Sequence, residues 1–203
     1  MAEKDPYQLL KHSQFILLFE QAEKAIKEVE RVHENLPVPA INELRYAAYH
    51  IKNFIKSPEI IDEIAKAEAH CQRAIYDAYE AGILFYHSAF HKFKDDYRNV
   101  VITDVIPEYI DYKEIFEASL EYIQGVDKEN KEQVYKKCAE YHAQLRQIIS
   151  KLDVAREELN KKIEQSRKKF MYWSLSVLVS LATIIVSVIL GWERIKLIFQ
   201  QLF

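Results

Sequence analysis

Two short segments hold the side chains best suited to chemistry. The first runs from Asn42 to His50 and contains Glu43 and Arg45. The second carries polar groups at helical spacing, namely His70, Arg73, Asp77 and Glu80. On two helices packed side by side, these segments would gather two arginines, two histidines and three carboxylates in one place. Such a cluster predicts either a ligand or catalytic site or a polar network that fixes the register of two helices. The ligand-binding candidates are Arg45, His50, His70 and Arg73.

Arg45 and His50 also fit the R-x4-H spacing of HEPN-type ribonucleases, which are small helical bundles. The resemblance implies that the pair would act on the scissile phosphate and on the attacking 2′-hydroxyl. The sequence departs from the family at Tyr46, because a polar residue usually follows the arginine. Five residues on one helix also place the two side chains about 140° apart, so a break in the helix would help them converge. As a HEPN-type ribonuclease, the chain would use Arg45 and His50 as catalytic residues. As a ligand-binding protein, it has no predicted catalytic residue.

Other residues predict neither a metal nor a cofactor. His87 and His91 lie four residues apart, but such a pair without a third ligand is more often a surface feature. Cys71 and Cys138 lie in helix-periodic segments, which favours small core residues over a disulfide framework. The sequence contains no glycine-rich phosphate loop and no H-E-x-x-H motif. A net charge of -3 argues against a strongly basic nucleic-acid surface, although it permits a local basic pocket.

The residues from Met171 to Trp192 form an apolar segment without a formal charge. As a helix this segment covers about 33 Å, enough for the hydrocarbon core of a bilayer. Aromatic residues lie at both of its ends, as in an aromatic belt. Five basic residues precede the segment, namely Lys161, Lys162, Arg167, Lys168 and Lys169, and only Arg194 and Lys196 follow it. The positive-inside rule therefore predicts a single-pass protein of the cell inner membrane with a cytoplasmic N-terminus.

Polar residues inside the apolar segment fall on one narrow face of the expected helix. They are Ser176, Ser180, Thr183 and Ser187, and Gly191 continues the same spacing. Hydroxyl and small side chains on one stripe let helices approach closely and form hydrogen bonds. This pattern predicts either an oligomer interface or the lining of a narrow pore. One helix cannot enclose a pore, so the second interpretation requires several chains.

Breakers and periodicity predict an all-α fold. We expect helices over residues 5–34, 40–56, 58–98 and 107–124, with a connector at 99–103. The last helix should begin near Asp127, because apolar residues alternate at spacings of four and three from Val134 to Leu159. This seam either only packs inside its own bundle or belongs to a rigid helix that couples movement in the soluble domain to the membrane segment. With no proline or glycine before Gly191, the same helix should continue into the apolar segment. The expected organisation is therefore a cytoplasmic helical-bundle sensor domain over 1–168, a transmembrane helix over 169–192 and a short extracytoplasmic tail over 193–203.

Two motifs, NELRYAAYHI and AEAHCQRAIYDAYE, followed by a membrane helix, resemble the helical, HEPN-like membrane effectors of bacterial antiphage defence, in particular the Hailong-type channel effector. The resemblance implies a homotetrameric channel in the inner membrane. Its cytoplasmic domains would bind a DNA oligomer made by a partner nucleotidyltransferase, and the oligomer would hold the channel closed until infection removes it. On this reading Arg45, His50, His70 and Arg73 contact the oligonucleotide, and Ser176, Ser180, Thr183 and Ser187 line the pore.

The sequence thus favours a homo-oligomeric membrane pore gated by a nucleotide or oligonucleotide, rather than an enzyme. A membrane-tethered HEPN-type ribonuclease is the first alternative. A membrane-anchored scaffold without catalysis, in which the polar cluster is only a structural network, is the second.

Overall fold

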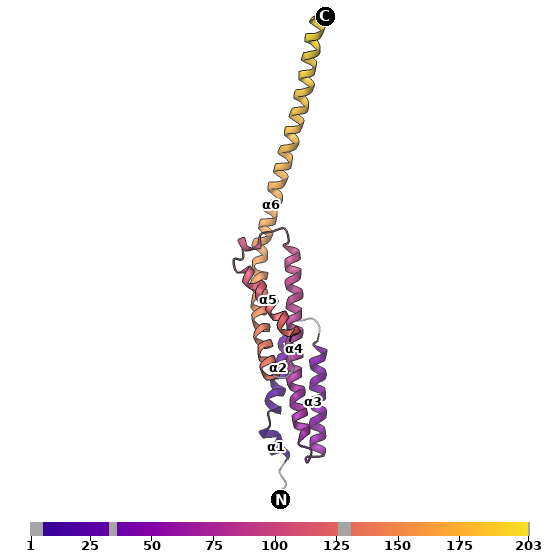
Figure 1. Cartoon of the computed structure of the whole chain (residues 1–203), viewed down its shortest axis with the longest axis vertical. Helices are drawn as coiled ribbons and strands as arrows, with labels where there is room; N and C mark the ends of the chain where they lie inside the picture. Colours follow the sequence, from indigo (N-terminus) through magenta and orange to yellow (C-terminus); the bar gives the residue numbers. More distant parts are fainter. Residues whose placement is uncertain (1–5, 33–35, 126–130, 203) are drawn as a thin grey trace. The chain divides into compact units, whose positions relative to one another are not determined.

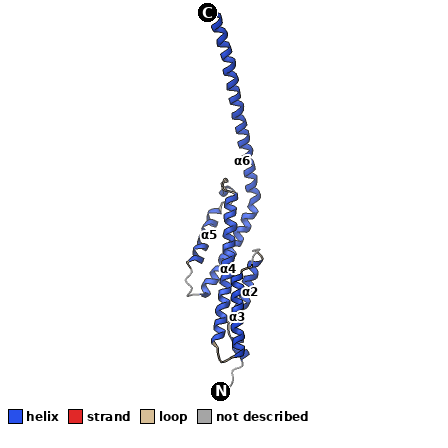
Figure 2. Cartoon of the chain, turned by 90° about the vertical axis from the view of Figure 1, so that its right-hand side faces the viewer, coloured by secondary structure: helices blue, strands red, loops and turns tan. Residues whose placement is uncertain are grey.

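The structure is a computed structural model that describes residues 6–32, 36–125 and 131–202. These residues form helices joined by turns and short connectors, and no strand occurs among them (Figures 1 and 2). The predicted all-α class is therefore confirmed. The helix start expected at Asp5 lies outside the described residues.

Most helices fall where the breakers predicted them. In chain order they are α1 Pro6–His12, α2 Phe15–Glu30, α3 Val38–Lys56, α4 Asp62–Asp96, the short 3-10 helix η1 Ile102–Asp104, α5 Tyr109–Gln124 and α6 Lys131–Leu202. Figure 1 shows them coloured along the chain. Each of the two long helices, α4 and α6, runs without interruption through a stretch that lacks proline.

The single helix expected over residues 5–34 is wrong, because the chain breaks between α1 and α2. Ser13 causes this break through local hydrogen bonds. Its hydroxyl donates to the Leu10 carbonyl at 2.6 Å and accepts from the Phe15 backbone N–H at 3.3 Å. The Gln14 N–H donates to the Glu68 carboxylate on α4 at 2.8 Å. A serine hydroxyl that binds nearby backbone groups competes with the backbone hydrogen bonds of a helix, and Ser13 does so between α1 and α2.

Small side chains allow α2 and α3 to pack closely along α4 (Figure 2). On α4 the buried small residues recur at spacings of three and four, at Ala67, Cys71, Ala74 and Ala78. Buried alanines of α2 and α3 belong to the same core cluster. Because these side chains are short, the backbones approach and the longer polar side chains at the rim of the α3–α4 contact reach one another.

The chain divides into two compact units, one of residues 1–98 and 102–154 and one of residues 99–101 and 155–203. Within the first unit the apolar seam of α6 faces inward, with Cys138, Leu145, Ile148 and Leu152 all buried. The structure therefore shows that this part of the seam packs inside the first unit.

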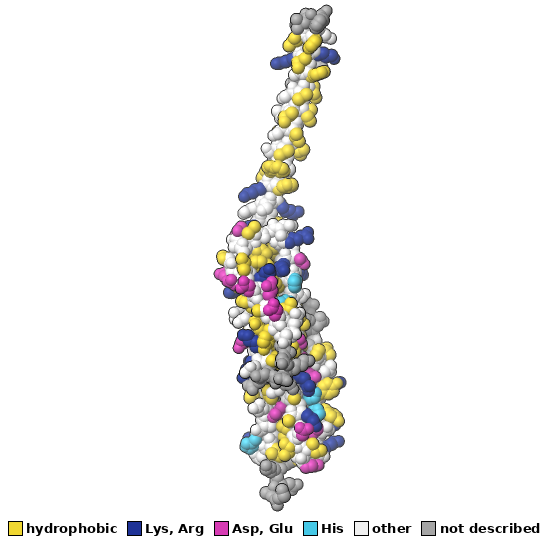
Figure 3. Space-filling view, viewed as in Figure 1, with side chains coloured by type: hydrophobic (Ala, Val, Ile, Leu, Met, Phe, Trp, Pro, Cys, Tyr) yellow, Lys and Arg dark blue, Asp and Glu magenta, His cyan; other side chains and the backbone are white. Residues whose placement is uncertain are grey.

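The second unit contains the apolar part of α6. Among the described residues, its large hydrophobic side chains from Phe170 to Trp192 are exposed, and the candidate membrane-spanning window contains no buried residue. Figure 3 shows hydrophobic side chains along this part of the helix, with Lys and Arg side chains at both ends. By length and composition α6 is apolar enough to cross a membrane. The helix also continues past Gly191 and ends at Leu202.

Candidate functional site

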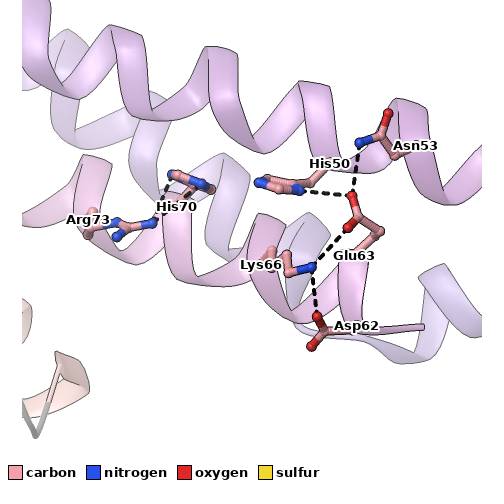
Figure 4. A network of polar contacts seen from close by, with 7 residues as sticks. All are labelled: His50, Asn53, Asp62, Glu63, Lys66, His70 and Arg73. Carbon is pink, nitrogen blue, oxygen red and sulfur yellow. Dashed lines mark hydrogen bonds and ion pairs between the residues drawn. The ribbon is translucent and has the colours of Figure 1, made fainter. Parts of the chain in front are cut away.

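The α3–α4 contact brings the imidazole rings of His50 and His70 together. His50 comes from the middle of α3 and His70 from the first half of α4. Their ring centroids lie 5.1 Å apart with an interplanar angle of 18°, so the two rings are stacked. Figure 4 shows both rings with polar partners reaching in from either side. This stacked pair is the centre of the candidate site.

Glu43 holds one half of the site. Its Oε2 accepts from His70 Nδ1 at 2.7 Å and from Arg73 Nε at 3.0 Å. Arg73 Nη2 also lies 3.0 Å from His70 Nδ1 (Figure 4). One imidazole nitrogen cannot donate to a carboxylate and accept from a guanidinium at once, so the short contact with Glu43 assigns the proton to Nδ1. The carboxylate therefore serves as an internal anion between a histidine and an arginine.

In the other half of the site, the shared hydrogen-bond acceptor is the carboxylate of Glu63. Its Oε2 accepts from His50 Nδ1 at 2.9 Å and from Asn53 Nδ2 at 3.1 Å. Its other oxygen accepts from Lys66 Nζ at 3.1 Å, and Lys66 also pairs with Asp62 at 2.8 Å (Figure 4). The hydrogen bond from His50, followed by those from Asn53 and Lys66, lowers the pKa of the Glu63 carboxyl to about 2. Glu63 is therefore ionised at any physiological pH.

Two exposed tyrosines extend the stacked histidines into a row of four aromatic rings. Tyr49 lies 5.6 Å from His50, edge to face, and Tyr46 lies 5.5 Å from His70. In order, the ring row is Tyr49, His50, His70 and Tyr46. The two tyrosines are 54% and 45% exposed, so both ends of the row present rings to solvent. Exposed rings of this kind are available for stacking by a flat ligand.

Cations lie over the tyrosines at both ends. The Arg45 guanidinium is 5.1 Å from the Tyr46 ring centroid, and Lys52 Nζ is 4.0 Å from that of Tyr49. Among the described residues, no carboxylate pairs with Arg45 or Lys52. The sequence from Leu44 to Lys56 contains no acidic residue at all. We call the exposed set Arg45, Tyr46, Tyr49, Lys52 and Lys56 the α3 stripe.

This arrangement suits a ligand that has both flat rings and phosphates. Aromatic faces stack on nucleobases regardless of base identity, and neighbouring Lys and Arg attract the backbone phosphates. In the Nδ1–H form, Nε2 of each histidine carries a lone pair that accepts a hydrogen bond. The network around Glu43 and Glu63 is different, because its cations Arg73 and Lys66 already have carboxylate partners. The exposed face of α3 is therefore better suited to bind an anion than this network.

All four sequence-predicted ligand residues lie in this region. His50, His70 and Arg73 belong to the two carboxylate-centred halves, and Arg45 lies on the exposed face. Their neighbour Glu80 instead accepts from the Tyr76 hydroxyl at 3.0 Å. The helix α3 runs unbroken through Arg45 and His50, so the break that would make them converge is absent from it.

Sequence reasoning missed Glu63 and the α3 stripe. Glu63 lies in the first turn of α4, where an acidic residue is ordinary and gives no signal of a partner on α3. The stripe did have a signal. Arg45, Tyr49, Lys52 and Lys56 follow one another at spacings of four, three and four, which places them on one helix face.

The expected pore-lining residues lie on the exposed part of α6. Ser180, Thr183 and Ser187 each donate their hydroxyl to a backbone carbonyl four residues earlier, at 2.8 to 2.9 Å. Ser176 supplies the carbonyl that Ser180 uses. Three of the four hydroxyls of the stripe are thus satisfied by the backbone of their own helix.

His87 has a structural setting. It is buried, its Nε2 lies 3.0 Å from the Ser119 hydroxyl on α5, and Phe116 packs edge-on against its ring. Burial lowers its pKa, which favours the neutral ring. Among the described residues, no group of three metal-ligating side chains gathers here or elsewhere.

No protein-family model, curated protein or solved structure matches this chain.

Proposed function

We propose that this chain is a homo-oligomeric effector of the bacterial inner membrane, gated by an oligonucleotide. Its N-terminal helices form a cytoplasmic bundle that binds the ligand, and its apolar α6 segments assemble a pore. A tetramer is the favoured assembly. A DNA oligomer made by a partner nucleotidyltransferase is the favoured ligand, and antiphage defence is the favoured role. The ligand contacts Arg45, His50, His70 and Arg73, and the pore face is Ser176, Ser180, Thr183 and Ser187.

The observation that carries the ligand assignment is the α3 stripe. Two exposed tyrosine rings each have a cation above them, and no carboxylate lies on the same stretch of α3. The chain has a net charge of -3, so this face carries a local excess of positive charge against the overall balance. Single-stranded nucleic acid is the ligand class that uses both features at once.

The observation that supports gating is the continuity of α6. One helix contains both the seam buried in the first unit and the apolar segment. Because a helix transmits rotation and translation along its axis, a change in how the seam packs would reach the apolar segment. A flexible linker would lose that movement. The basic residues before the apolar segment support a cytoplasmic ligand-binding side.

The first experiment purifies the full-length chain in detergent, measures its mass, and titrates it with a fluorescent single-stranded DNA oligomer. We expect an oligomer that binds the probe with a steep salt dependence. The same preparation, placed in a planar bilayer, should conduct ions, and the probe should change the conductance. A monomer that neither binds the probe nor conducts would overturn the proposal.

Two variants separate the alternatives. Arg45→Ala should weaken DNA binding in the proposed effector, whereas it should abolish RNA cleavage in a HEPN-type ribonuclease. Ser180→Leu should change conductance in the effector and leave a ribonuclease untouched. A plain membrane-anchored scaffold would show neither conductance nor cleavage before either substitution.

A further inference from the structure

The buried ring of His142 on α6 packs directly against Gly82 on α4, and we call this contact the seat of the ring. A Cβ atom at position 82 would lie 2.5 Å from Cδ2 and 2.8 Å from Nε2 of His142, and 3.1 Å from Val29 on α2. The His142 ring also lies 5.2 Å from the rings of both Tyr79 and Tyr86 on α4. Glycine is therefore required at position 82 because the imidazole occupies the space of a side chain.

The His142 ring is buried, with one of its two nitrogens unpaired. His142 is 3% exposed, and its Nε2 has no hydrogen-bond partner among the described residues. The Tyr86 hydroxyl beside it is likewise buried and unpartnered within that part of the chain. A neutral imidazole tolerates this environment far better than an imidazolium, which would bury a charge with an unsatisfied N–H.

The two charged groups near the ring have opposite effects on the pKa of His142. Glu28 on α2, which accepts from the Tyr79 hydroxyl at 3.2 Å, raises the pKa of His142, and Arg146 on α6 lowers it. Burial is the largest influence, and together they lower the pKa to about 4, against an ordinary value of 6.5. Glu28, His142 and Arg146 also line one open groove of about 580 Å³ between α2 and α6, so solvent lies close to the ring.

We propose that His142, with Gly82, Tyr79 and Tyr86, is a proton-sensitive latch that holds the first-unit part of α6 against α2 and α4. At neutral pH the uncharged ring stays seated on Gly82. Protonation favours the state in which the ring leaves its seat and reaches water, so acid loosens this part of α6. The proposal concerns the packing of α6 alone and holds whether or not the chain forms a pore.

Two native cysteines report on the latch. Cys138 lies on α6 one turn before His142, and Cys71 lies on α4 in the core with α2 and α3. Both are fully buried, and burial raises the pKa of each thiol to about 12, so both react slowly while the helices stay packed. Loosening of α6 exposes Cys138 alone, whereas global unfolding exposes both.

The experiment treats the full-length chain in detergent with dithiodipyridine, a disulfide reagent that also works in acid, and follows each cysteine by mass spectrometry. The measured quantity is the Cys138 rate divided by the rate of the same cysteine in His142→Phe at the same pH, which removes the intrinsic pH dependence of the reagent. Between about pH 7.5 and about pH 5, the pKa change predicts a rise of about 25-fold in this ratio. Cys138 should also react faster than Cys71 at each pH, because only global unfolding exposes Cys71. A constant ratio, or equal rates of the two cysteines, would overturn the proposal.

Variants assign the effect to the ring and to its seat. His142→Phe and His142→Leu introduce an apolar side chain that binds no proton, so the Cys138 rate of His142→Leu relative to His142→Phe should not respond to pH. Gly82→Ala should raise the Cys138 rate already at neutral pH, because the added methyl displaces the imidazole. Gly191→Ala is the matched control, since a Cβ there meets nothing within 4 Å. An acid response that persists in His142→Leu, or a Cys138 rate in Gly82→Ala equal to that in Gly191→Ala, would contradict the latch.

Discussion

Arg45 and Lys52 differ from the other cations of the site in what lies beside them. Arg73 and Lys66 are paired with carboxylates, whereas Arg45 and Lys52 lie over tyrosine rings. A cation over an aromatic face keeps its attraction for a phosphate, because the ring carries no net charge. The residues that bind an anion most readily are therefore those on the exposed surface of α3.

Tyr49→Ala tests the stacking surface. Removal of the ring should weaken binding of single-stranded DNA by about 1–3 kcal/mol, because one base loses its stacking partner. Fluorescence anisotropy with a labelled oligomer measures the change. Tyr49→Phe is the control, since it keeps the ring, and its affinity should stay close to that of the unchanged protein. Equal losses in the two variants would rule out stacking as the cause.

Glu43→Gln tests the internal anion. The carboxylate accepts from His70 and pairs with Arg73, so its removal should free both for a phosphate. We expect tighter binding of the same oligomer, about tenfold, and a steeper dependence on salt concentration. Weaker binding would mean that Glu43 positions the ring row instead of competing with the ligand. Glu68→Gln, on α4 but outside the network, is the comparison.

The spacing of His50, His70 and Arg73 on two expected helices predicted that these residues lie together. It could not show which carboxylate each of them contacts. Glu43 was one of three acidic candidates on these two segments, and only the register of α3 on α4 places it against Arg73. Glu63 lay outside the recognised segments, yet it makes the most hydrogen bonds in the network. Register depends on packing between distant segments, which local periodicity does not encode.

At the scale of elements, α4 organises the first unit, with α2 and α3 packed along its small residues. The boundaries of α3, α5 and α4 followed from proline, glycine and the apolar period. The break at Ser13 did not, because the competing hydrogen bonds come partly from Glu68, which is far away in the sequence. The seam of α6 was visible as a pattern, but its burial within the same chain was not.

Leu145→Ala tests the α6 seam. Leu145 is fully buried, so its truncation leaves a cavity and should lower the free energy of unfolding by about 2–5 kcal/mol. Val154, on the same helix, is 80% exposed, and Val154→Ala should change stability by less than about 0.5 kcal/mol. Urea unfolding of the full-length chain in detergent, followed by circular dichroism, measures both. Similar values for the two variants would show that the seam does not pack inward.

For the whole molecule, acid should act in two stages. The latch responds between the ordinary His pKa of 6.5 and about 4 without unfolding the remaining helices. Glu63, whose folded pKa is lowered from 4.5 to about 2, stabilises the fold at any pH above 4.5. Because the unfolded carboxyl binds a proton first, that contribution is lost as the pH falls from 4.5 towards 2.

We therefore expect helix content to stay constant down to about pH 4.5, while the unfolding midpoint in urea falls first as the pH drops below 6.5, because of His142, and again below 4.5, because of Glu63. Glu63→Gln should flatten the second fall, since its side chain does not titrate. Asp95→Asn, at an exposed position near the other end of α4, is the comparison and should follow the unchanged protein. An acid profile of Glu63→Gln that matches the unchanged protein would assign acid sensitivity to other carboxyls.

The hydroxyls of Ser180, Thr183 and Ser187 already have partners on their own backbone. A helix of this kind carries few unmet polar groups into lipid, so a single chain would insert without waiting for neighbours. Assembly would then be a separate, later step that depends on how many chains share the same bilayer. For the proposed pore, a cell that holds few copies would contain dispersed chains that do not conduct, and the conductance would rise steeply with expression level.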